Sequence, residues 1–435
     1  MVAAIGYLTL FALVIFLMRG KISPIAVFGT IPIIGALLIM ADVNSINEWI
    51  GEGLSTVWKT AVLFIFSVEY FGIMSDVGMF DVIVNRLVKL AGSNVILVAV
   101  ATALIAVVGH LDGATATTVL VTVPAMIPLW RRLKMRPTGM LFIVGTAMGV
   151  MNLVPWGGPI VRVATVLETD VTELWHLILP FQIVCLFVTV IVAVIVGILE
   201  KRHGAGVFTE QERNAEQTKQ ADPAVEALKR PKLIGFNIAL TAVLLVILIL
   251  GVVSTHVAFM VALALALIIN YPDAKLQRAR FRAHAGNALD TAATLLAAAI
   301  FIGIMQNSGM LDAMVDVLLS IIPDSIGNFM NLIAGVIAVP VGSCLGADTF
   351  YYGLFPLIGE AAESFGVPSL DVGIAMLIGK NVAMLCSPLQ PTTYLAIGLA
   401  GIELKEQLRA NFGRTWLLSI IMCGIAIAMG LMQIY

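Results

Sequence analysis

Apolar stretches separated by short polar segments cover most of the chain. A helix of about 20 residues crosses the roughly 30 Å hydrocarbon core of a bilayer. Ten of the stretches are that long or slightly shorter, so the pattern predicts an all-α polytopic membrane protein. The predicted crossings are residues 2–18, 24–41, 57–74, 137–154, 176–199, 233–253, 257–271, 286–307, 370–385 and 412–434.

Two further apolar regions, 95–130 and 325–357, have a different pattern. Each consists of two arms around a polar tip that contains glycine, at residues 109–113 in the first region and 342–348 in the second. An arm of about 15 residues reaches only about 22 Å as a helix, too short to cross comfortably. Both regions are therefore predicted to be re-entrant hairpins that return to the side from which they entered.

The charged residues test this topology. If both hairpins are re-entrant and the chain starts outside, every Lys and Arg except Lys59, Arg162 and Lys380 falls in an inner loop. The outer loops are acidic, as the positive-inside rule requires of a multi-pass protein in the cell (inner) membrane. This arrangement predicts that both termini lie outside. The predicted organisation is scaffold helices at 1–56 and 233–282, a first repeat at 57–199, a cytoplasmic linker at 200–232 and a second repeat at 283–435.

Composition excludes other classes of protein. Of the 435 residues, 60% are apolar and 12% are charged, whereas soluble globular proteins carry about a quarter charged residues. A disordered chain, a secreted disulfide scaffold and an ordinary cytosolic enzyme are all excluded. The four cysteines lie in apolar surroundings without metal-ligand spacing and are predicted to be free thiols. No cofactor, resident metal or nucleic-acid partner is expected.

A ten-residue motif occurs twice. Residues 72–81 recur at 303–312 with six of ten positions identical. An amphipathic stretch, a hairpin and a broken helix follow each copy. In the predicted topology the first copy runs inward and the second outward. Inverted repeats with hairpins and broken helices are typical of secondary transporters whose site lies near the bilayer midplane.

The two broken helices, 137–167 and 370–400, point to the site. Prolines and glycines interrupt the first at residues 152–159 and the second at 386–393. Unwound backbone is tolerated in a membrane only where it is buried in protein or lines a polar cavity. The half-helices after the breaks and the second hairpin arms would point four positive N-termini at one cavity, which suits an anion. Prolines that only shape packing are the alternative.

Polar and small residues at the tips and breaks supply the candidate site. Arg162 is predicted to be the principal anion contact, because its fork matches a carboxylate; a structural pair with Asp112 is the alternative. The substrate-binding candidates are Gly113, Thr115, Thr117, Asn152, Trp156, Gly157, Gly158, Arg162, Ser343, Gly346, Asp348, Thr349, Lys380, Ser387, Thr392 and Thr393. The coupling-ion candidates are His110, Asp112, Asp348 and Lys380.

Several of these candidates have second interpretations. Asp112 could instead cap a helix, and Lys380 could contact a carboxylate, occupy a cation site or extend toward the interface. Glu69 is expected to pair at a domain interface. The other histidines are predicted to lie at loops and to have no role; they are His176, His203, His256 and His284.

These motifs resemble a known family. His110-Leu111-Asp112-Gly113 and the stretch 149–159 with Arg162 resemble signatures of the citrate–metal:proton symporter (CitMHS) family, within the ion-transporter superfamily. In the second half, residues 348–353 and 387–401 resemble the corresponding signatures of the same family. The resemblance implies a homodimer in which a transport domain moves against a scaffold domain by an elevator motion. It also implies uptake of citrate complexed to a divalent metal such as Mg²⁺ or Ca²⁺, driven by protons.

The chain departs from this family pattern at two places. The first tip reads Leu-Asp-Gly-Ala-Thr instead of Leu-Asp-Gly-Asp-Gly, so a second acid is missing, and the pair Lys380-Asn381 is not expected. One carboxylate fewer and one ammonium more favour a free carboxylate or a different coupling ion over a metal complex.

The sequence therefore predicts a symporter for a di- or tricarboxylate such as citrate, or its metal complex, coupled to H⁺ or Na⁺. A cation/proton antiporter or a transporter of another organic anion in the same superfamily is the alternative. A channel fits inverted repeats less well. An intramembrane enzyme is disfavoured because no HExxH motif or Ser/His dyad is present.

Overall fold

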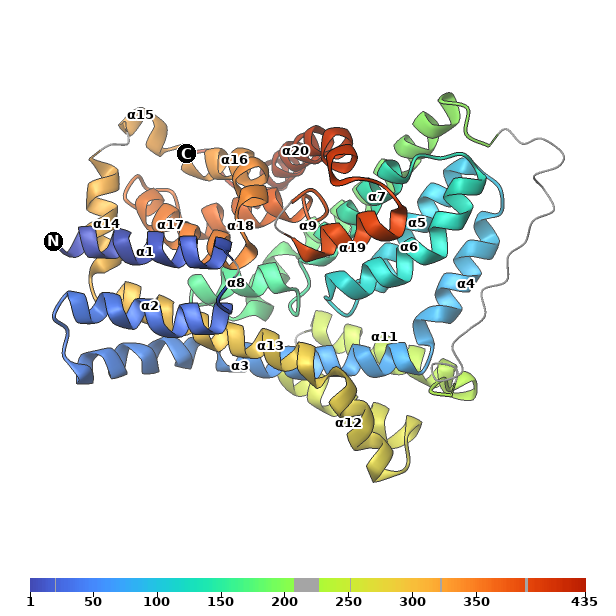
Figure 1. Cartoon of the computed structure of the whole chain (residues 1–435), viewed down its shortest axis with the longest axis horizontal. Helices are drawn as coiled ribbons and strands as arrows, with labels where there is room; N and C mark the ends of the chain where they lie inside the picture. The colour runs from blue at the N-terminus through green and yellow to red at the C-terminus, as the bar shows by residue number, and fades with distance from the viewer. Residues whose placement is uncertain (20, 207–226, 251, 321–322, 388–389) are drawn as a thin grey trace.

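The computed structural model describes residues 1–19, 21–206, 227–250, 252–320, 323–387 and 390–435, and these residues contain helices but no strand (Figure 1). Most of the predicted linker, 207–226, lies outside the described residues. The prediction of an all-α fold is confirmed for the described part of the chain.

The first half of the chain runs from α1 to α9. Its helices are α1 Val2–Arg19, α2 Pro24–Leu38, α3 Val43–Asp76, α4 Met79–Ala91, α5 Val95–Gly109, α6 Thr115–Arg132, α7 Pro137–Met151, α8 Gly158–Val166 and α9 Val171–Arg202.

The second half repeats this order with small differences. It contains a 3₁₀ turn η2 Pro231–Leu233, α11 Ile234–Leu250, α12 Thr255–Asn270, α13 Ala274–Asn307, α14 Met310–Leu319, α15 Asp324–Gly327, α16 Met330–Cys344, a π-helical segment η3 Thr349–Leu354, α17 Phe355–Glu363, α18 Ser369–Asn381, α19 Pro391–Ala400 and α20 Leu404–Ala428.

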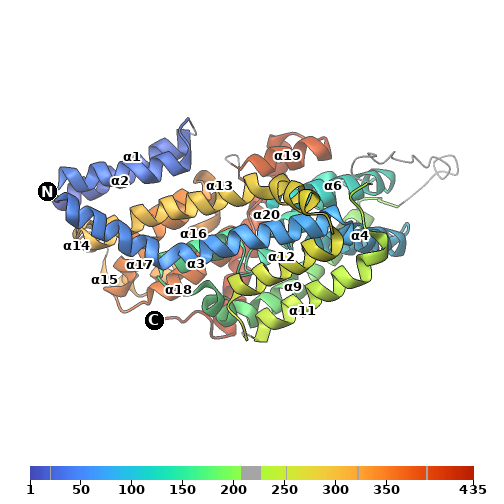
Figure 2. The same cartoon turned by 90° about the horizontal axis from the view of Figure 1, so that it is seen from below.

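Two long helices, α3 and α13, form the spine of the molecule. Each is 34 residues long, and Figures 1 and 2 both show them side by side. They are antiparallel, because Gly53 near the start of α3 packs on Gly303 near the end of α13, whereas Gly72 packs on His284 near the start. The absence of a glycine side chain permits this close approach. The predicted crossings 57–74 and 286–307 are therefore only the apolar parts of longer helices.

The duplicated motif folds in the same way in both halves. Gly78 and Gly309 adopt positive φ angles of 81° and 72°, a conformation that glycine reaches without steric cost. Each glycine ends a long helix and starts the amphipathic helix α4 or α14. Figure 1 shows these two amphipathic helices at opposite ends of the spine.

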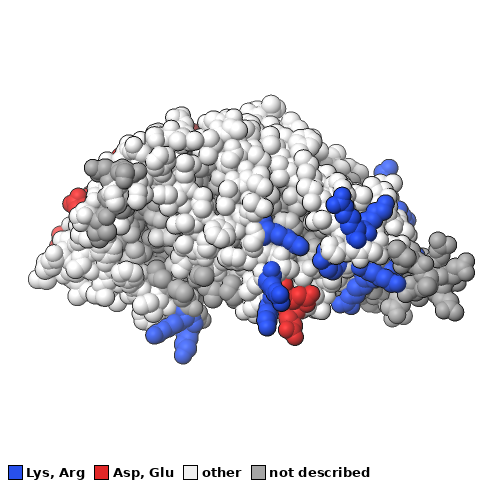
Figure 3. Space-filling view, turned by 90° about the horizontal axis from the view of Figure 1, so that it is seen from above, with Lys and Arg blue, Asp and Glu red and all other residues white. Residues whose placement is uncertain are grey.

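Five helices of the described chain are long and apolar enough to cross a membrane by length and composition: Val43–Asp76, Val171–Arg202, Pro231–Leu250, Ala288–Asn307 and Leu404–Ala428. Six shorter apolar helices accompany them. The number of ten crossings stays a prediction. Most of the Lys and Arg side chains on the face in Figure 3 lie over its right-hand half, an uneven distribution of the kind that the positive-inside rule describes.

Both predicted hairpins are present as helical pairs. The first joins α5 and α6 through residues 110–114, close to the predicted arms. The second joins α16 to η3 and α17 through 345–348, and its second arm continues to Glu363. The predicted end of this hairpin at 357 was therefore too early, because α17 continues as a regular helix beyond it.

Candidate functional site

A cavity of about 400 Å³ lies where the two hairpin tips, the two broken helices and the long spine meet. Its polar lining residues are Asp112, Thr115, Thr117, Asn152, Trp156, Arg162, Asp290, Tyr351, Lys380, Asn381 and Gln390. Phe64 and Val68 of α3 and Met384 add apolar surface. Residues from both halves of the chain thus share one chamber.

Four helical segments begin at the tips and breaks, as the sequence predicts. They start at Thr115, Gly158, Thr349 and Pro391, either inside the predicted tips and breaks or at most two residues after them. Thr115 and Gly158 line the cavity directly. Free backbone N–H groups at a helix start favour negative charge, so at least α6 and α8 present positive ends to the cavity.

The first tip is tied to the first break through His110. This side chain is completely buried, with Nδ1 2.6 Å from Thr118 Oγ1 and Nε2 3.0 Å from Asn152 Oδ1. Trp156 Nε1 donates a hydrogen bond of 2.7 Å to the carbonyl oxygen of Leu111. With these bonds the two ring nitrogens of His110 already have partners, and the ring does not line the cavity.

Asp112 both lines the cavity and closes the turn of the first tip. Its Oδ1 accepts a hydrogen bond of 2.8 Å from the backbone N–H of Ala114. Gly113 follows with a φ angle of 70° and packs against Trp156. The hydrogen bond of Asp112 closes the turn of the tip but does not cap α6, whose N-cap residue is Ala114, and the Thr117 side chain also interacts with the carboxylate.

Arg162 is paired with an acid that differs from the one considered in the sequence. Its Nη2 and Nε lie 2.7 and 2.8 Å from Asp348 Oδ1 at the second tip. The pairing with Asp112 considered above is therefore wrong, because the fold places the second tip next to the first break. Asp348 and Tyr352 line a neighbouring cavity of about 210 Å³, which shares Arg162 with the main one.

A second bond also crosses between the halves. Thr115 Oγ1 at the first tip lies 3.0 Å from Thr392 Oγ1 just after the second break, and α6 packs on α19. Within the second half, Ser387 Oγ donates to the carbonyl oxygen of Ser343 at 2.8 Å. Each tip is thereby joined to the break of the opposite half as well as to its own.

Lys380 and Asn381, at the end of α18, are buried and line the cavity. Lys380 Nζ lies 4.5 Å from the centre of the Phe350 ring and 3.5 Å from the carbonyl oxygen of Leu345. Among the described residues no carboxylate lies within 4.0 Å of this ammonium. Neither side-chain polar atom of Asn381 has a hydrogen-bond partner there.

The structure separates the predicted site residues into two groups. Those that line the main cavity are Asp112, Gly113, Thr115, Thr117, Asn152, Trp156, Gly158, Arg162 and Lys380. Those that lie behind it or beside it are His110, Gly157, Ser343, Gly346, Asp348, Thr349, Ser387, Thr392 and Thr393. Buried hydroxyl oxygens of Ser343, Thr349 and Thr393 have no hydrogen-bond partner among the described residues.

The spine contributes one wall of the cavity, which was not predicted from the sequence. Phe64 and Val68 of α3 and Asp290 of α13 line the cavity. Asp290 could have been found, since an acid inside the predicted crossing 286–307 is a functional candidate by default. The two apolar residues carry no such signal, because they resemble every other residue of a membrane helix.

The loop position expected for the remaining histidines is confirmed for His203, which directly follows α9, and is wrong for the other three. His176, His256 and His284 lie within α9, α12 and α13, not at loops, because these helices extend beyond the predicted spans. His284 Nε2 lies 3.0 Å from Asp76 Oδ2. Glu69, expected to pair at an interface, is fully buried, and neither of its oxygens has a hydrogen-bond partner among the described residues.

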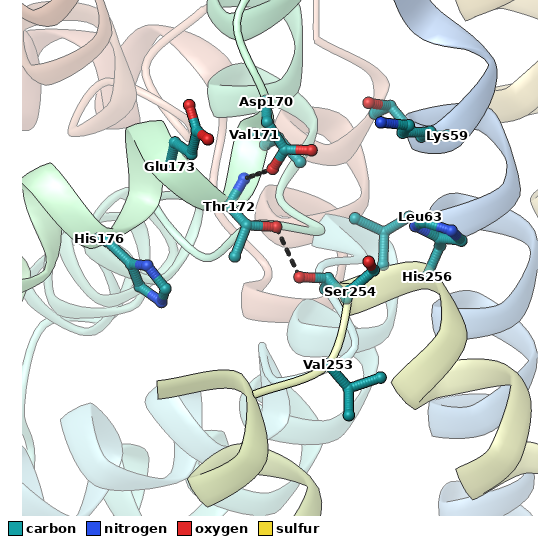
Figure 4. Close-up of a pocket in the computed structure, with 12 residues that line it drawn as sticks. Lys59, Leu63, Asp170, Val171, Thr172, Glu173, His176, Val253, Ser254 and His256 are labelled. Carbon is teal, nitrogen blue, oxygen red and sulfur yellow. Dashed lines mark hydrogen bonds between the residues drawn. The ribbon is translucent and has the colours of Figure 1, made fainter. Parts of the chain in front are cut away.

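A second pocket, of about 290 Å³, lies between α3, the start of α9 and the segment before α12 (Figure 4). Lys59, Asp170, Glu173, His176 and His256 line it. Its polar groups are partly engaged in the helix starts; for example, Asp170 Oδ1 accepts from the backbone N–H of Thr172 at 2.8 Å. Within the described residues no group of three or more His, Cys, Asp or Glu side chains could hold a metal ion.

An all-α membrane protein with two helical hairpins and two broken helices around a shared cavity has the architecture of a secondary transporter. Comparison with known proteins agrees. A solved structure, the YdaH transporter of Alcanivorax borkumensis, shares the fold, with a TM-score of 0.60, 14% identity and 88% of each chain covered. The chain belongs to the CitMHS citrate transporter family, whose model matches residues 8–379.

Two relatives from Bacillus subtilis align over their whole length. One, described as a citrate transporter, is 34% identical, and the other, described as a Mg²⁺/citrate complex secondary transporter, is 33% identical; each covers 100% of both chains. Family membership confirms the predictions of a multi-pass membrane protein, of secondary carboxylate transport and of a protein that is not an enzyme.

Proposed function

We propose that the chain is a symporter for citrate or a closely related di- or tricarboxylate, coupled to H⁺ or Na⁺, in the cell (inner) membrane. The observation that carries this proposal is the central cavity, which gathers the starts of α6 and α8, Arg162 and Lys380 in one chamber. Positive helix ends and cationic side chains in a poorly hydrated site suit a multivalent anion. The names of both relatives support citrate as the first substrate to test.

The experiment is a ligand-induced stability screen of the purified protein. Citrate, succinate, malate and tricarballylate are added, each with and without Mg²⁺, Ca²⁺ and Na⁺, because any ligand that binds the folded state raises its unfolding temperature. We expect at least one carboxylate to stabilise the protein, with citrate or tricarballylate strongest. If no carboxylate shifts the transition under any ion condition while the protein remains monodisperse, the proposed substrate class is wrong.

The two halves form an inverted repeat in this proposal. Gly72 corresponds to Gly303 in the two copies of the motif, and the same difference in residue number makes Gly53 correspond to His284. The structure contains a contact of Gly72 with His284 and a contact of Gly53 with Gly303. A pair of contacts that exchanges partners in this way is expected of two segments related by a two-fold axis. The matching 34-residue helices α3 and α13 support the same relation.

An elevator motion is the transport mechanism that this symmetry favours. The crosswise bonds Arg162–Asp348 and Thr115–Thr392 tie tips and breaks into one body, whereas the spine contributes mainly Phe64, Val68 and Asp290 to the cavity wall. We propose that the tied body moves against the spine, in a homodimer. A disulfide between cysteines placed at Gly113 and Val68 should stop turnover; full transport by the cross-linked protein would exclude the motion.

The proposed topology has ten crossings, two re-entrant hairpins and both termini outside. Single cysteines at Arg86 and Arg131 flank the first hairpin, so both should react with a membrane-impermeant reagent only from the cytoplasm. A cysteine at Glu363, after the second hairpin, should react only from outside. Labelling of positions 86 and 131 from opposite faces would show that the first hairpin crosses the membrane.

The coupling ion is proposed to act at the first tip. Asp112 lines the cavity, and one of its two carboxylate oxygens takes no part in the hydrogen bond to Ala114 that closes the turn of the tip. A carboxylate substrate that enters beside it brings like charges together, so uptake of a proton or Na⁺ with the substrate lowers the repulsion. Linkage then makes substrate and cation raise each other's affinity, which Asp112→Asn should abolish in a transport assay across a pH or Na⁺ gradient.

A further inference from the structure

The cavity contains two cationic side chains, and their surroundings differ. Arg162 is neutralised, because two of its nitrogens lie within hydrogen-bond distance of Asp348 Oδ1. Lys380 is only 5% exposed, and no carboxylate of the described chain lies within 4.0 Å of its ammonium. Of the two side chains, Lys380 is therefore the one whose amino group has no carboxylate partner among the described residues.

The fold holds this ammonium in place. The side-chain stem of Lys380 packs against Gly342 on α16, where an added Cβ would lie 2.9 Å from both Cγ and Cδ. Nζ then faces the rings of Phe350 and Tyr351, at 4.5 and 5.3 Å from their centres. A lysine carries three N–H donors, and the only hydrogen bond among the described residues is a long one, 3.5 Å, to Leu345.

A neighbouring side chain also lacks partners. Asn381, 2% exposed, lines the same cavity, and its amide oxygen and nitrogen have no hydrogen-bond partner among the described residues. A buried polar group without a partner costs free energy, and so does a buried charge. An unmatched ammonium beside an unmatched amide is the pattern of a site completed by a ligand that accepts hydrogen bonds.

We propose that Lys380 binds a carboxylate of the substrate at the place a substrate-bound metal ion would take, so that this chain transports the metal-free anion. The inference rests on the proposed function and deepens it by choosing between free citrate and its metal complex. It also changes the sequence prediction, since the principal anion contact becomes Lys380 while Arg162 joins the two halves.

The ammonium of Lys380 opposes a metal ion beside it. Mg²⁺ and Ca²⁺ are hard cations that require oxygen ligands, and a buried ammonium repels a divalent cation. In the described chain no cluster of three or more His, Cys, Asp or Glu side chains could hold a metal. Asp112 and Asp290 also line the cavity and repel an anion, so a carboxylate of the substrate is expected to lie beside the ammonium of Lys380.

The test is calorimetric binding of citrate to the purified full chain, first in EDTA-containing buffer and then with enough Mg²⁺ to complex nearly all the citrate. Metal-free citrate should bind, and complexation should weaken the apparent affinity at least about tenfold. Lys380→Gln should weaken binding of metal-free citrate by about tenfold to a hundredfold, the range of a charge-assisted contact. Lys380→Arg should retain more affinity. Lys59→Gln, which removes a lysine outside the cavity, is the matched control.

Tighter binding of Mg²⁺-citrate than of metal-free citrate by the unmodified protein would overturn the inference, and this arm does not depend on how any variant folds. Unchanged affinity in a well-folded Lys380→Gln protein would do the same. Absence of citrate binding under both metal conditions is a different result, because it contradicts the proposed substrate rather than the role of Lys380.

Discussion

Hydrogen bonds around His110 join the first tip to the first break, whereas Lys380 and Asn381, just before the second break, lie outside any such network of the described residues. In the first half His110 contacts Thr118 and Asn152, and Trp156 donates to Leu111. In the second half Lys380 has no carboxylate partner and Asn381 has no hydrogen bond among the described residues. The two regions thus differ in how many of their polar groups have partners, although Asn152 Nδ2 in the first region also lacks one among the described residues.

Because of this difference, we expect the two regions to contribute differently to stability and to binding. A buried hydrogen-bonded network is rigid and is expensive to disturb, so the network around His110 should contribute mainly to stability and to the shape of the cavity. Unsatisfied groups cost stability in the free protein and regain it when a ligand supplies partners. The second half should therefore contribute more to binding than to folding.

The largest effect is expected at the ion pair that joins the halves. Arg162→Ala leaves Asp348 without its partner, which costs 3–5 kcal/mol at a fully buried site. Both side chains are 20% exposed, so a loss of about 2–3 kcal/mol in the free energy of unfolding is expected. Adding Asp348→Asn should restore part of it. Equal stability of the single and double variants would show that the pair is not coupled.

The next largest effect is expected at the hydrogen-bonded network around His110. His110→Ala removes a buried ring and leaves Thr118 and Asn152 without it, at a cost of about 2 kcal/mol. Ser343→Ala at the second tip is the matched control, because its hydroxyl has no partner to lose among the described residues. Denaturant titrations of both variants measure the difference. A similar cost at both positions would remove the contrast between the tips.

Asn381→Ala should have the opposite profile. Its amide has no partner in the described chain, so the free energy of unfolding should change by less than about 1 kcal/mol. Affinity for the carboxylate substrate should fall roughly tenfold, equivalent to about 1.4 kcal/mol. Calorimetric unfolding and calorimetric titration of the same preparation measure the free energy of unfolding and the substrate affinity. A large loss of stability with unchanged affinity would place Asn381 in the structural group.

The smallest effect is expected at the neutral bond between Thr115 and Thr392. Thr392→Val keeps the shape but removes one hydroxyl, at a cost of about 0.5–1 kcal/mol. The bond joins the first tip to the second break, so transport rate should fall more than stability if tips and breaks move together. Unchanged transport in liposomes would show that Arg162 and Asp348 hold the body without it.

The hairpins, the breaks and the helix starts could be read from the sequence because each has a local cause. Glycines and prolines interrupt helices wherever they occur. The pairing of Arg162 with Asp348 could not be read, because it depends on how two distant segments pack. The length of α3 was underestimated since residues 43–56 are polar, although Asp42 accepts from the backbone N–H groups of Asn44 and Ser45 and so marks the true start of the helix.

Hydrogen–deuterium exchange with and without saturating citrate tests the contrast between the two halves most directly. Peptides covering the second tip, 342–349, and the end of α18, 378–387, report on the region around Lys380 and Asn381. Peptides covering 109–115 and 150–158 report on the region around His110. Citrate should slow exchange more strongly in the second-half peptides than in the first-half peptides, because Lys380 and Asn381 gain the hydrogen-bond partners that they lack in the free protein. Protection confined to the first-half peptides would contradict the account.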